Sequence, residues 1–483
     1  MNGELPKGWV WTSLGEIALK LRSGGTPLKK MNEYYENGTI PFVKIEDITS
    51  SHKFLYKAAT YITKEGLDNS SSWIVPENSL LYSMYASYGM PIINKIEVAT
   101  NQAIIAFIPP KGLIELDYIY YYLLSIRQSL KSKIRGTTQE NLNAKIVSNI
   151  QIPLPPLAEQ QRIVSKIEEL FTNLDKGVES INSVKYKLKI YRQAILKYAM
   201  EGKLTEKWRE KNKNKIESAS ILLEKIKEKS INKNLKLMPI DLSTLSEIPN
   251  NWEWVRLGTV MDMTSGKAFK KIEYSNGGLK LLQITNVSFG RIKWDNIEYL
   301  PFDYGLLNEN LLLKAGDILM ALNRPILNGE LKIGMVKEKD LPSILYQRVG
   351  RFDLFYKEIK DYIYFYCHSP FFINKLKNSL QGVDQPFINK PRLLEITVPL
   401  PPLEEQNIIV ERIEQLFSLA DYIEETVNSK LEQSKTLRQS ILKKAFEGKL
   451  VPQDPNDEPA EILLEKIKKQ RLNKEKIVQE KLV

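Results

Sequence analysis

The chain has 483 residues, 43% of them hydrophobic, and a formal net charge of +11. This length suits two or more domains, and the basic balance is compatible with a polyanionic partner without requiring one. One cysteine excludes an intrachain disulfide, two histidines cannot build a His/Cys metal site, and no apolar run approaches the ~20 residues of a membrane span. The N-terminus does not read as a signal peptide, so we expect a cytoplasmic protein.

Residues 1–152 predict a domain of short strands with at least one helix. Short apolar runs occupy residues 40–45, 80–82 and 103–108, and turn residues separate them, as is typical of strands. Residues 117–131, rich in tyrosine and leucine, predict a helix. The segment is large enough for a core of its own.

The sequence of residues 153–204 is repeated, with changes, at residues 399–450. The offset is 246 throughout, and 28 of the 52 aligned positions are identical. Self-similarity at a fixed offset sets the architecture of a chain. In both copies the apolar residues recur in steps of three and four, which predicts a helix with a seam close to a heptad.

The ends of each copy carry helix boundary signals. A Pro-Pro pair opens each copy, and proline is tolerated in a first helical turn. Glu159 and Glu405 suit the positive end of a helix dipole, and Gly202 and Gly448 suit a C-terminal stop. Each helix should have about 40 residues and span roughly 60 Å. Two interpretations remain, namely unrelated amphipathic helices on separate domains or, as we favour, two copies packed antiparallel as a rigid spacer.

A charged tail follows each copy. The pattern Ile-Leu-Leu-Glu-Lys-Ile-Lys occurs at residues 221–227 and again at residues 462–468. It predicts two short helices with a small apolar face. Such a charged segment is usually solvated surface, but the recurrence favours a docking role.

Residues 249–398 predict a second domain on the frame of the first. Trp252 and Trp254 echo Trp9 and Trp11, while most other residues differ between the two segments. We expect these tryptophans to lie in the cores, with base stacking as the alternative.

Motifs of known catalytic chemistry are missing from the sequence. We find no Gly-rich loop for a dinucleotide or S-adenosylmethionine, no phosphate-binding loop and no hydrolase or metalloprotease signature. The Asp/Asn-Pro-Pro-Tyr/Phe signature of amino-methyltransferases is also missing, because leucine follows each Pro-Pro pair. This favours a non-catalytic chain, although an enzyme with an unrecognised site stays open.

With its repeat, the ends of that repeat and the tails, the chain resembles over essentially its full length the specificity subunits of type I restriction–modification systems. Residues 445–460 carry the resemblance most clearly. Residues 205–208 depart from the family's Val-Pro-Gln-Asp form, which leaves the docking of the first tail open. The resemblance implies an α+β fold, with two mixed α/β target-recognition domains separated by two long helices that pack as an antiparallel coiled coil with pseudo-two-fold symmetry. The expected segments are recognition domain 1 (1–152), spacer helix 1 with its charged tail (153–240), recognition domain 2 (241–398) and spacer helix 2 with the C-terminal tail (399–483).

The resemblance also implies a function without catalysis. Each recognition domain would read one half of an asymmetric bipartite site in double-stranded DNA, and the helices would set the gap. Two adenine methyltransferase subunits would dock on the helices, and restriction subunits with motor and nuclease activity would join through them. S-adenosylmethionine and ATP would bind to those partners, with no cofactor or metal on this chain. A stand-alone architectural DNA-binding protein is the alternative.

Base reading needs polar or basic side chains on loops that can enter a groove. Each candidate has the alternative of being an ordinary surface residue. The DNA-binding candidates are Ser23, Gly24, Gly25, Thr26, Lys29, Lys30, Ser83, Tyr85, Tyr88, Arg135, Thr137, Thr138 and Gln139 in the first domain, and Ser265, Lys267, Lys270, Lys271, Asn323, Arg324, Gln381 and Gln385 in the second. The candidates for binding a partner subunit are apolar helix residues beyond the seam, namely Val164, Phe171, Val410 and Phe417. Four residues inserted near Lys197 should lengthen the gap between the half-sites.

Overall fold

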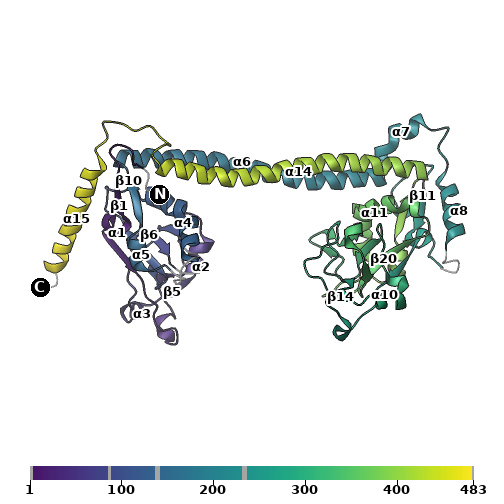
Figure 1. Ribbon diagram of the computed structural model, residues 1–483, viewed down its shortest axis with the longest axis horizontal. Helices are drawn as coiled ribbons and strands as arrows, with labels where there is room; N and C mark the ends of the chain where they lie inside the picture. Colours follow the sequence, from purple (N-terminus) through teal and green to yellow (C-terminus); the bar gives the residue numbers. More distant parts are fainter. Residues whose placement is uncertain (1–3, 85–88, 136–141, 231–235, 481–483) are drawn as a thin grey trace. The chain divides into compact units, whose positions relative to one another are not determined.

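The computed structural model describes residues 4–84, 89–135, 142–230 and 236–480, without the side chains of 131–135 and 474–480. The chain forms two compact units, which we call unit 1 (residues 1–182 and 428–483) and unit 2 (residues 183–427). Each unit contains a mixed α/β domain, part of both long helices and one tail (Figure 1). The expectation of mixed α/β domains with two long helices is confirmed. The division falls within both helices, so each unit combines segments that are far apart in the sequence.

The domain of unit 1 is built on a five-stranded sheet of order β2-β9-β6-β7-β4 and a three-stranded sheet of order β5-β3-β8. The central strands are buried along their whole length, which explains their continuous apolar runs. The strands are β1 (Val10–Ser13), β2 (Lys20–Ser23), β3 (Ile40–Val43), β4 (Phe54–Leu55), β5 (Thr60–Ile62), β6 (Leu80–Ser83), β7 (Pro91–Asn94), β8 (Ala99–Thr100), β9 (Ile104–Ile108) and β10 (Gln151–Leu154). The helices are α1 (Leu14–Ile17), α2 (Ile45–Ser50), α3 (Lys64–Asp68), α4 (Leu116–Arg135) and α5 (Ala144–Ser148).

The domain of unit 2 follows the same plan with a four-stranded sheet of order β12-β20-β15-β18 and a three-stranded sheet of order β14-β13-β19. Antiparallel pairs join the start and end of each domain, β1 with β10 and β11 with β21. The strands are β11 (Glu253–Arg256), β12 (Met261–Ser265), β13 (Leu279–Leu282), β14 (Tyr299–Leu300), β15 (Ile318–Ala321), β16 (Ile326–Leu327), β17 (Glu330–Leu331), β18 (Ile333–Met335), β19 (Ser343–Leu345), β20 (Val349–Leu354) and β21 (Thr397–Leu400). The helices are α9 (Leu257–Val260), α10 (Asp303–Leu307), α11 (Lys360–His368), α12 (Pro370–Ser379) and α13 (Lys390–Leu394).

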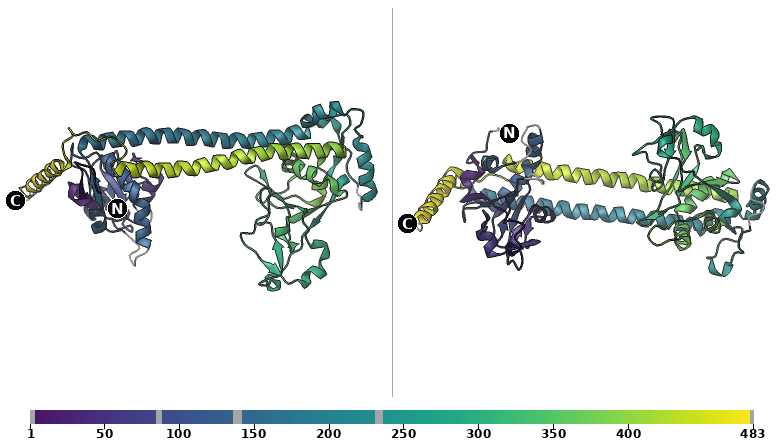
Figure 2. Two further views of the ribbon diagram at one scale, coloured as in Figure 1. Left: turned by 45° about the horizontal axis from the view of Figure 1, so that its top comes forward. Right: turned by 90° about the horizontal axis from the view of Figure 1, so that it is seen from below.

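The repeated segments form α6 (Leu157–Met200) and α14 (Leu403–Phe446), each of 44 residues. Both begin directly after the Pro-Pro pair and end just before a glycine in the left-handed conformation, Gly202 at φ 71° and Gly448 at φ 66°. The boundaries expected from the sequence are therefore confirmed. Within each unit, the sections of the two helices lie side by side (Figures 1 and 2).

Within each unit the helices pair antiparallel through the same residue types. In unit 1, Arg438 of α14 forms an ion pair with Asp175 of α6 and covers the ring of Phe171 at 4.8 Å. In unit 2, Arg192 of α6 forms an ion pair with Asp421 at 2.6 Å and covers the ring of Phe417 at 5.3 Å. These pairs occupy equivalent positions of the repeat, so each unit contains the same contact with the roles of the helices exchanged.

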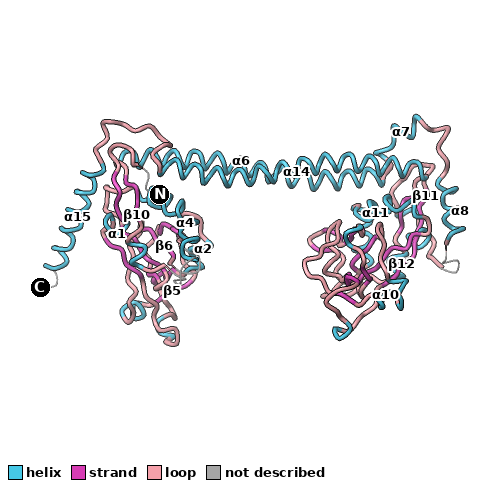
Figure 3. Tube along the Cα trace, in the orientation of Figure 1, coloured by secondary structure: helices cyan, strands magenta, loops and turns pink. Residues whose placement is uncertain are grey.

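The core of each unit joins its domain to both helices. In unit 1, Ile163 of α6 and Ile441 of α14 belong to the domain core, and in unit 2 Ile409 and Ile195 do the same. In unit 2, α11 packs between the strands and α14 (Figure 3). Phe365 meets Phe417 there edge to face at 6.0 Å. Burial of this apolar surface fixes each domain on its section of the helices.

Both tails are docked by their apolar residues. In unit 2, α7 (Glu206–Lys211) leads to α8 (Ala219–Lys229), whose Leu222 and Ile226 are buried in the core. In unit 1, α15 (Ala460–Glu480) buries Leu463 and Ile467 in the same way. The amide of Ala460 donates to the carbonyl of Gly8 at 2.9 Å. The expected docking role is confirmed, but α15 has 21 residues and is not short, because its charged sequence contains no helix stop.

Candidate nucleic-acid interface

In unit 1, several loops converge at one end of the five-stranded sheet. The amide of Gly24 donates to Ile104 at 3.3 Å, and that of Met84 donates to Ala103 at 2.8 Å. Leu142 then donates its amide to Met84 at 3.3 Å. These bonds join the loops that follow β2 and β6, the loop before β9 and the segment before α5. We call residues 23–27, 83–84, 89, 100–103 and 142 loop cluster 1.

Unit 2 repeats this convergence with different side chains. The amide of Gly266 donates to Val349 at 3.1 Å, that of Leu322 to Arg348 at 2.8 Å, and that of Ile388 to Leu322 at 2.9 Å. We call residues 265–271, 322–325, 346–348 and 380–388 loop cluster 2. Among the DNA-binding candidates that the structure describes, Lys29 and Lys30 lie just beyond loop cluster 1 and Arg135 ends α4. The other described candidates lie on one of these two clusters.

The described candidates of loop cluster 1 are largely engaged within the domain. Gly24 and Gly25 are buried, and a Cβ on Gly24 would lie 1.8 Å from the carbonyl oxygen of Thr100. Ser83 is fully buried and its Oγ accepts a hydrogen bond from the amide of Met90, which is a structural role. Half-buried positions are held by Ser23 and Thr26, while Lys29 and Lys30 are exposed. Tyr85, Tyr88, Thr137, Thr138 and Gln139, and the side chain of Arg135, lie outside the described residues.

Loop cluster 2 is more open. Gln381 is half-buried and its Oε1 accepts a hydrogen bond from Asn389 at 2.8 Å, so this amide is already partnered. Asn323 is half-buried. The exposed candidates are Ser265, Lys267, Lys270, Lys271, Arg324 and Gln385. Unit 2 therefore offers several basic side chains to a ligand at this end of its sheet.

Sequence reasoning missed Gln102, Gln347 and Arg348. Thr26 donates its hydroxyl to Oε1 of Gln102 at 2.5 Å, which joins two loops of cluster 1. Gln347 and Arg348 directly precede β20, as Gln102 and Ala103 precede β9. Polar residues just before a buried strand were the available signal, but only strand pairing places them beside the other loops.

The tryptophans divide between the core and the surface. Trp9 and Trp252 are buried, as expected. Trp11 is 40% exposed, so the expectation of a core position was wrong for it, and Trp254 is half-buried beneath Lys375. Trp9 and Trp252 directly precede β1 and β11, whereas Trp11 and Trp254 lie within these strands.

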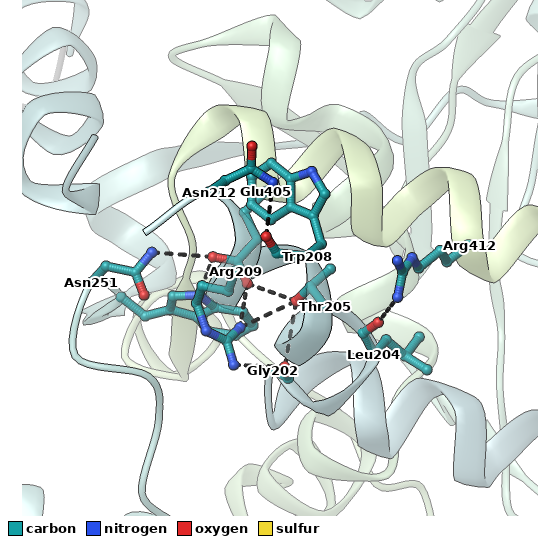
Figure 4. A network of polar contacts seen from close by, with 10 residues as sticks. Gly202, Leu204, Thr205, Trp208, Arg209, Asn212, Asn251, Glu405 and Arg412 are labelled. Carbon is teal, nitrogen blue, oxygen red and sulfur yellow. Dashed lines mark hydrogen bonds and ion pairs between the residues drawn. The ribbon is translucent and has the colours of Figure 1, made fainter. Parts of the chain in front are cut away.

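The buried tryptophans contact the first turn of the long helices. Nε1 of Trp9 donates to Glu159 at 2.9 Å, and Nε1 of Trp252 donates to Glu405 at 2.9 Å. Glu405 also accepts hydrogen bonds from Thr205 at 2.6 Å and from Arg209 at 2.5 Å (Figure 4). The segment at 205–208 that departs from the family pattern therefore leads into an alternative docking network, and this tail is firmly docked.

The partner-binding candidates are packed within their own units. Val164 is buried in the core of unit 1, and Val410 packs against the core of unit 2. Phe171 meets Tyr121 edge to face at 5.8 Å, as Phe417 meets Phe365. Their role toward a partner stays a prediction, but charge at the phenylalanines would disturb the chain's own core first.

The described part of the chain contains neither a metal-ligand cluster nor a membrane-spanning helix. No group of three or more His, Cys, Asp or Glu residues is placed there to hold a metal ion. No helix in the same residues is both long and apolar enough to cross a bilayer.

The sequence model of the family described as the type I restriction modification DNA specificity domain matches residues 6–185 and 249–433. The chain belongs to this family. The MjaVIII specificity subunit of Methanocaldococcus jannaschii is 32% identical over 459 residues, which are 93% of this chain and 95% of that protein. The EcoKI specificity subunit of Escherichia coli is 28% identical over 491 residues, which are 97% of each chain.

Solved structures share the fold. A chain from a study of complex assembly and conformational transition of the type I R-M system has a TM-score of 0.64 at 20% identity, covering 92% of this chain and 100% of that one. The HsdS subunit from Thermoanaerobacter tengcongensis has a TM-score of 0.51 at 20% identity, covering 93% of this chain and 99% of that one. In sequence, each region matched by the family model contains one domain and much of the long helix after it.

Proposed function

We propose that this chain is the DNA-reading subunit of a type I restriction–modification complex and has no active site of its own. The observation that carries this proposal is the pair of loop clusters, built on equivalent strands with the same backbone hydrogen bonds but different side chains. A shared frame with divergent loops suits two readers of two different sequences. Basic and polar side chains on such loops can reach base edges in a groove.

The repeated helices suit a spacer between the two readers. Because the contact between arginine, aspartate and phenylalanine recurs in both units, we propose that α6 and α14 form an antiparallel coiled coil with approximate two-fold symmetry. Two different readers on such a frame would recognise an asymmetric bipartite site with an unread gap. The predicted segment boundaries, with recognition domains at 1–152 and 241–398, fit this division of roles.

Two methyltransferase subunits would bind along the helices and supply the S-adenosylmethionine chemistry, with restriction subunits and ATP joining through them. An apolar stripe supports such docking in unit 2. Val184, Tyr191 and Tyr198 recur every seven residues on α6 and are 39%, 39% and 49% exposed. Heptad spacing places them on one side of the helix. If this stripe is the docking surface, Tyr191→Glu should reduce methyltransferase co-purification, while retention at the wild-type level would exclude the stripe.

The experiment that tests the function is co-expression with the methyltransferase encoded beside this chain, followed by sequencing of the methylated DNA. We expect a stable complex that methylates one bipartite motif. A stand-alone architectural protein would instead bind DNA without retaining the methyltransferase. A monodisperse chain that fails to bind this methyltransferase would contradict the proposal.

A length variant then tests the spacer. The structure argues against insertion near Lys197, because Ile195, Leu196 and Ala199 around it are buried in the core of unit 2. Four residues are better inserted into both helices at the division between the units, after Asn182 and after Val427. Each insertion adds about one turn, roughly 6 Å, and DNA rises about 3.4 Å per base pair. We expect the same half-sites with a gap longer by one or two base pairs, whereas changed half-sites with an unchanged gap would exclude the spacer role.

A further inference from the structure

Two arginines of loop cluster 2 adopt an uncommon backbone conformation. Five non-glycine residues among those described have positive φ, and three of these are asparagines, which tolerate it. The other two are Arg324 at φ 46° and Arg348 at φ 65°. Strain of this kind persists only where the surrounding structure imposes it, and it is concentrated at ligand-binding and functional sites.

The surrounding backbone holds both arginines beside each other. Arg348 directly precedes β20 and Arg324 follows β15, and these strands pair with Ala321 opposite Val349. The carbonyl of Arg348 accepts the amide of Leu322 at 2.8 Å, and the amide of Arg324 donates to Pro386 at 2.6 Å. The two residues therefore project from neighbouring strand ends rather than from a freely moving loop.

Neither guanidinium has a hydrogen-bond or ion-pair partner within the described part of the chain, and both residues are exposed. Several other arginines of unit 2 have partners, as Arg351 has in Asp353 at 2.7 Å. The carboxylate of Glu330, in β17 of the hairpin that follows Arg324, pairs with Lys189 at 2.6 Å. The guanidinium groups of Arg324 and Arg348 are therefore exposed and unpaired on a backbone held in place, as expected of groups that bind a ligand from outside the chain.

The equivalent position in unit 1 carries no charge. The amide of Met84 donates to Ala103 just as that of Leu322 donates to Arg348. Ala103 is buried and cannot reach a ligand. The arginine is therefore not required by the shared frame, which makes it a feature of what unit 2 recognises.

We propose that Arg324 and Arg348 determine the specificity of unit 2, each reading a guanine through its O6 and N7 atoms in the major groove. This rests on the proposed function. A planar fork on a fixed backbone suits the two adjacent acceptors of guanine, which is the commonest specific contact of arginine with DNA. The exposed Lys267, Lys270 and Lys271 of the same cluster suit the phosphates, for which a point charge suffices.

The test is the methylation motif of the complete complex carrying Arg324→Ala or Arg348→Ala. Each variant should lose the requirement for one guanine, about tenfold or more in preference, in one half-site only. Arg348→Lys should weaken the requirement for the same guanine, because lysine keeps the charge but lacks the planar guanidinium with its two parallel donors. Lys357→Ala is the matched control, since it removes an exposed charge beyond the opposite end of β20 and should leave the motif unchanged.

Glycine variants separate recognition from folding. Because glycine populates positive φ readily, Arg324→Gly and Arg348→Gly should raise the Tm of the chain while losing the same guanines. A variant motif that keeps every base of both half-sites overturns the inference and leaves the proposed function standing. Uniform weakening at all sites, with Arg348→Lys equal to the wild type, also overturns it, because phosphate contacts would explain that result. A wild-type complex with no bipartite motif contradicts the proposed function instead.

Discussion

Glu159 in unit 1 and Glu405 in unit 2 occupy equivalent places in the first turn of the two long helices, and both are buried. Their surroundings differ. Glu405 is bonded to Trp252, Thr205 and Arg209, with Asn251 at 3.2 Å as a further donor.

Glu159 has only Trp9 as a hydrogen-bond donor among the described residues, and its Oε1 is buried without a partner. The nearby Arg162 instead pairs with Asp457 of the second tail at 2.6 Å. Burial raises the pKa of Glu159, opposed by the hydrogen bond from Trp9. The same position of the fold therefore has two different surroundings. In unit 2 the tail neutralises the buried carboxylate, and in unit 1 the tail leaves one of its oxygens without a hydrogen-bond partner.

The largest effect expected from this difference is at Arg209. Arg209→Ala would leave Glu405 buried without its counterion, and loss of one partner of a buried ion pair costs about 3 kcal/mol. The matched change Arg162→Ala should cost about 1 kcal/mol, because that pair is more exposed and does not include Glu159. Hydrogen exchange, measured on the full chain and read from peptides of each unit, shows which unit has lost stability. Equal losses in the two units would show that the tails stabilise their carboxylates alike.

A smaller effect is expected when the tryptophan donors are removed. Trp9→Phe should cost roughly 2 kcal/mol, because Glu159 loses its donor and stays buried. Trp252→Phe makes the same change in packing but leaves Glu405 three other donors, so it should cost about 1 kcal/mol. Urea denaturation of the two variants measures the difference. A Trp252→Phe variant as unstable as Trp9→Phe would mean that packing rather than hydrogen bonding dominates.

The smallest expected effect is a gain in folding stability rather than a loss. The raised pKa of Glu159 means that the folded state binds this proton more tightly than the unfolded state, so its contribution to stability is largest below the ordinary carboxyl range and is lost as pH rises through the raised pKa. Glu159→Gln should therefore flatten this dependence and leave stability at neutral pH unchanged or higher by up to about 1 kcal/mol. Thermal melts from acid to neutral pH check this.

The control for that prediction is Glu405→Gln, which should destabilise unit 2 because it leaves Arg209 without its carboxylate. If both glutamine variants lost the same stability, the two carboxylates would be energetically equivalent. The contrast between the units would then be geometric only.

The sequence alone is enough to predict the elements whose signals are local. The period of the apolar residues and the proline and glycine at each end were enough to place α6 and α14, and the recurrence of Ile-Leu-Leu-Glu-Lys-Ile-Lys indicated that both tails dock. It also placed most candidate loops, since turn residues between apolar runs mark strand ends. These features depend on neighbours three or four residues away, so a single sequence contains them.

Which of these loops come together, and what each side chain contacts, depends on long-range packing. Trp9 and Glu159 are 150 residues apart, and the bond between Leu322 and Arg348 depends on the register of β15 with β20. The counterion of Glu405, Arg209, comes from a tail that departs from the family pattern, and the left-handed backbone of Arg348 has no signature in its residue type. Such features arise from long-range strand pairing and core packing, which act on residues distant in the chain, so local periodicity does not contain them.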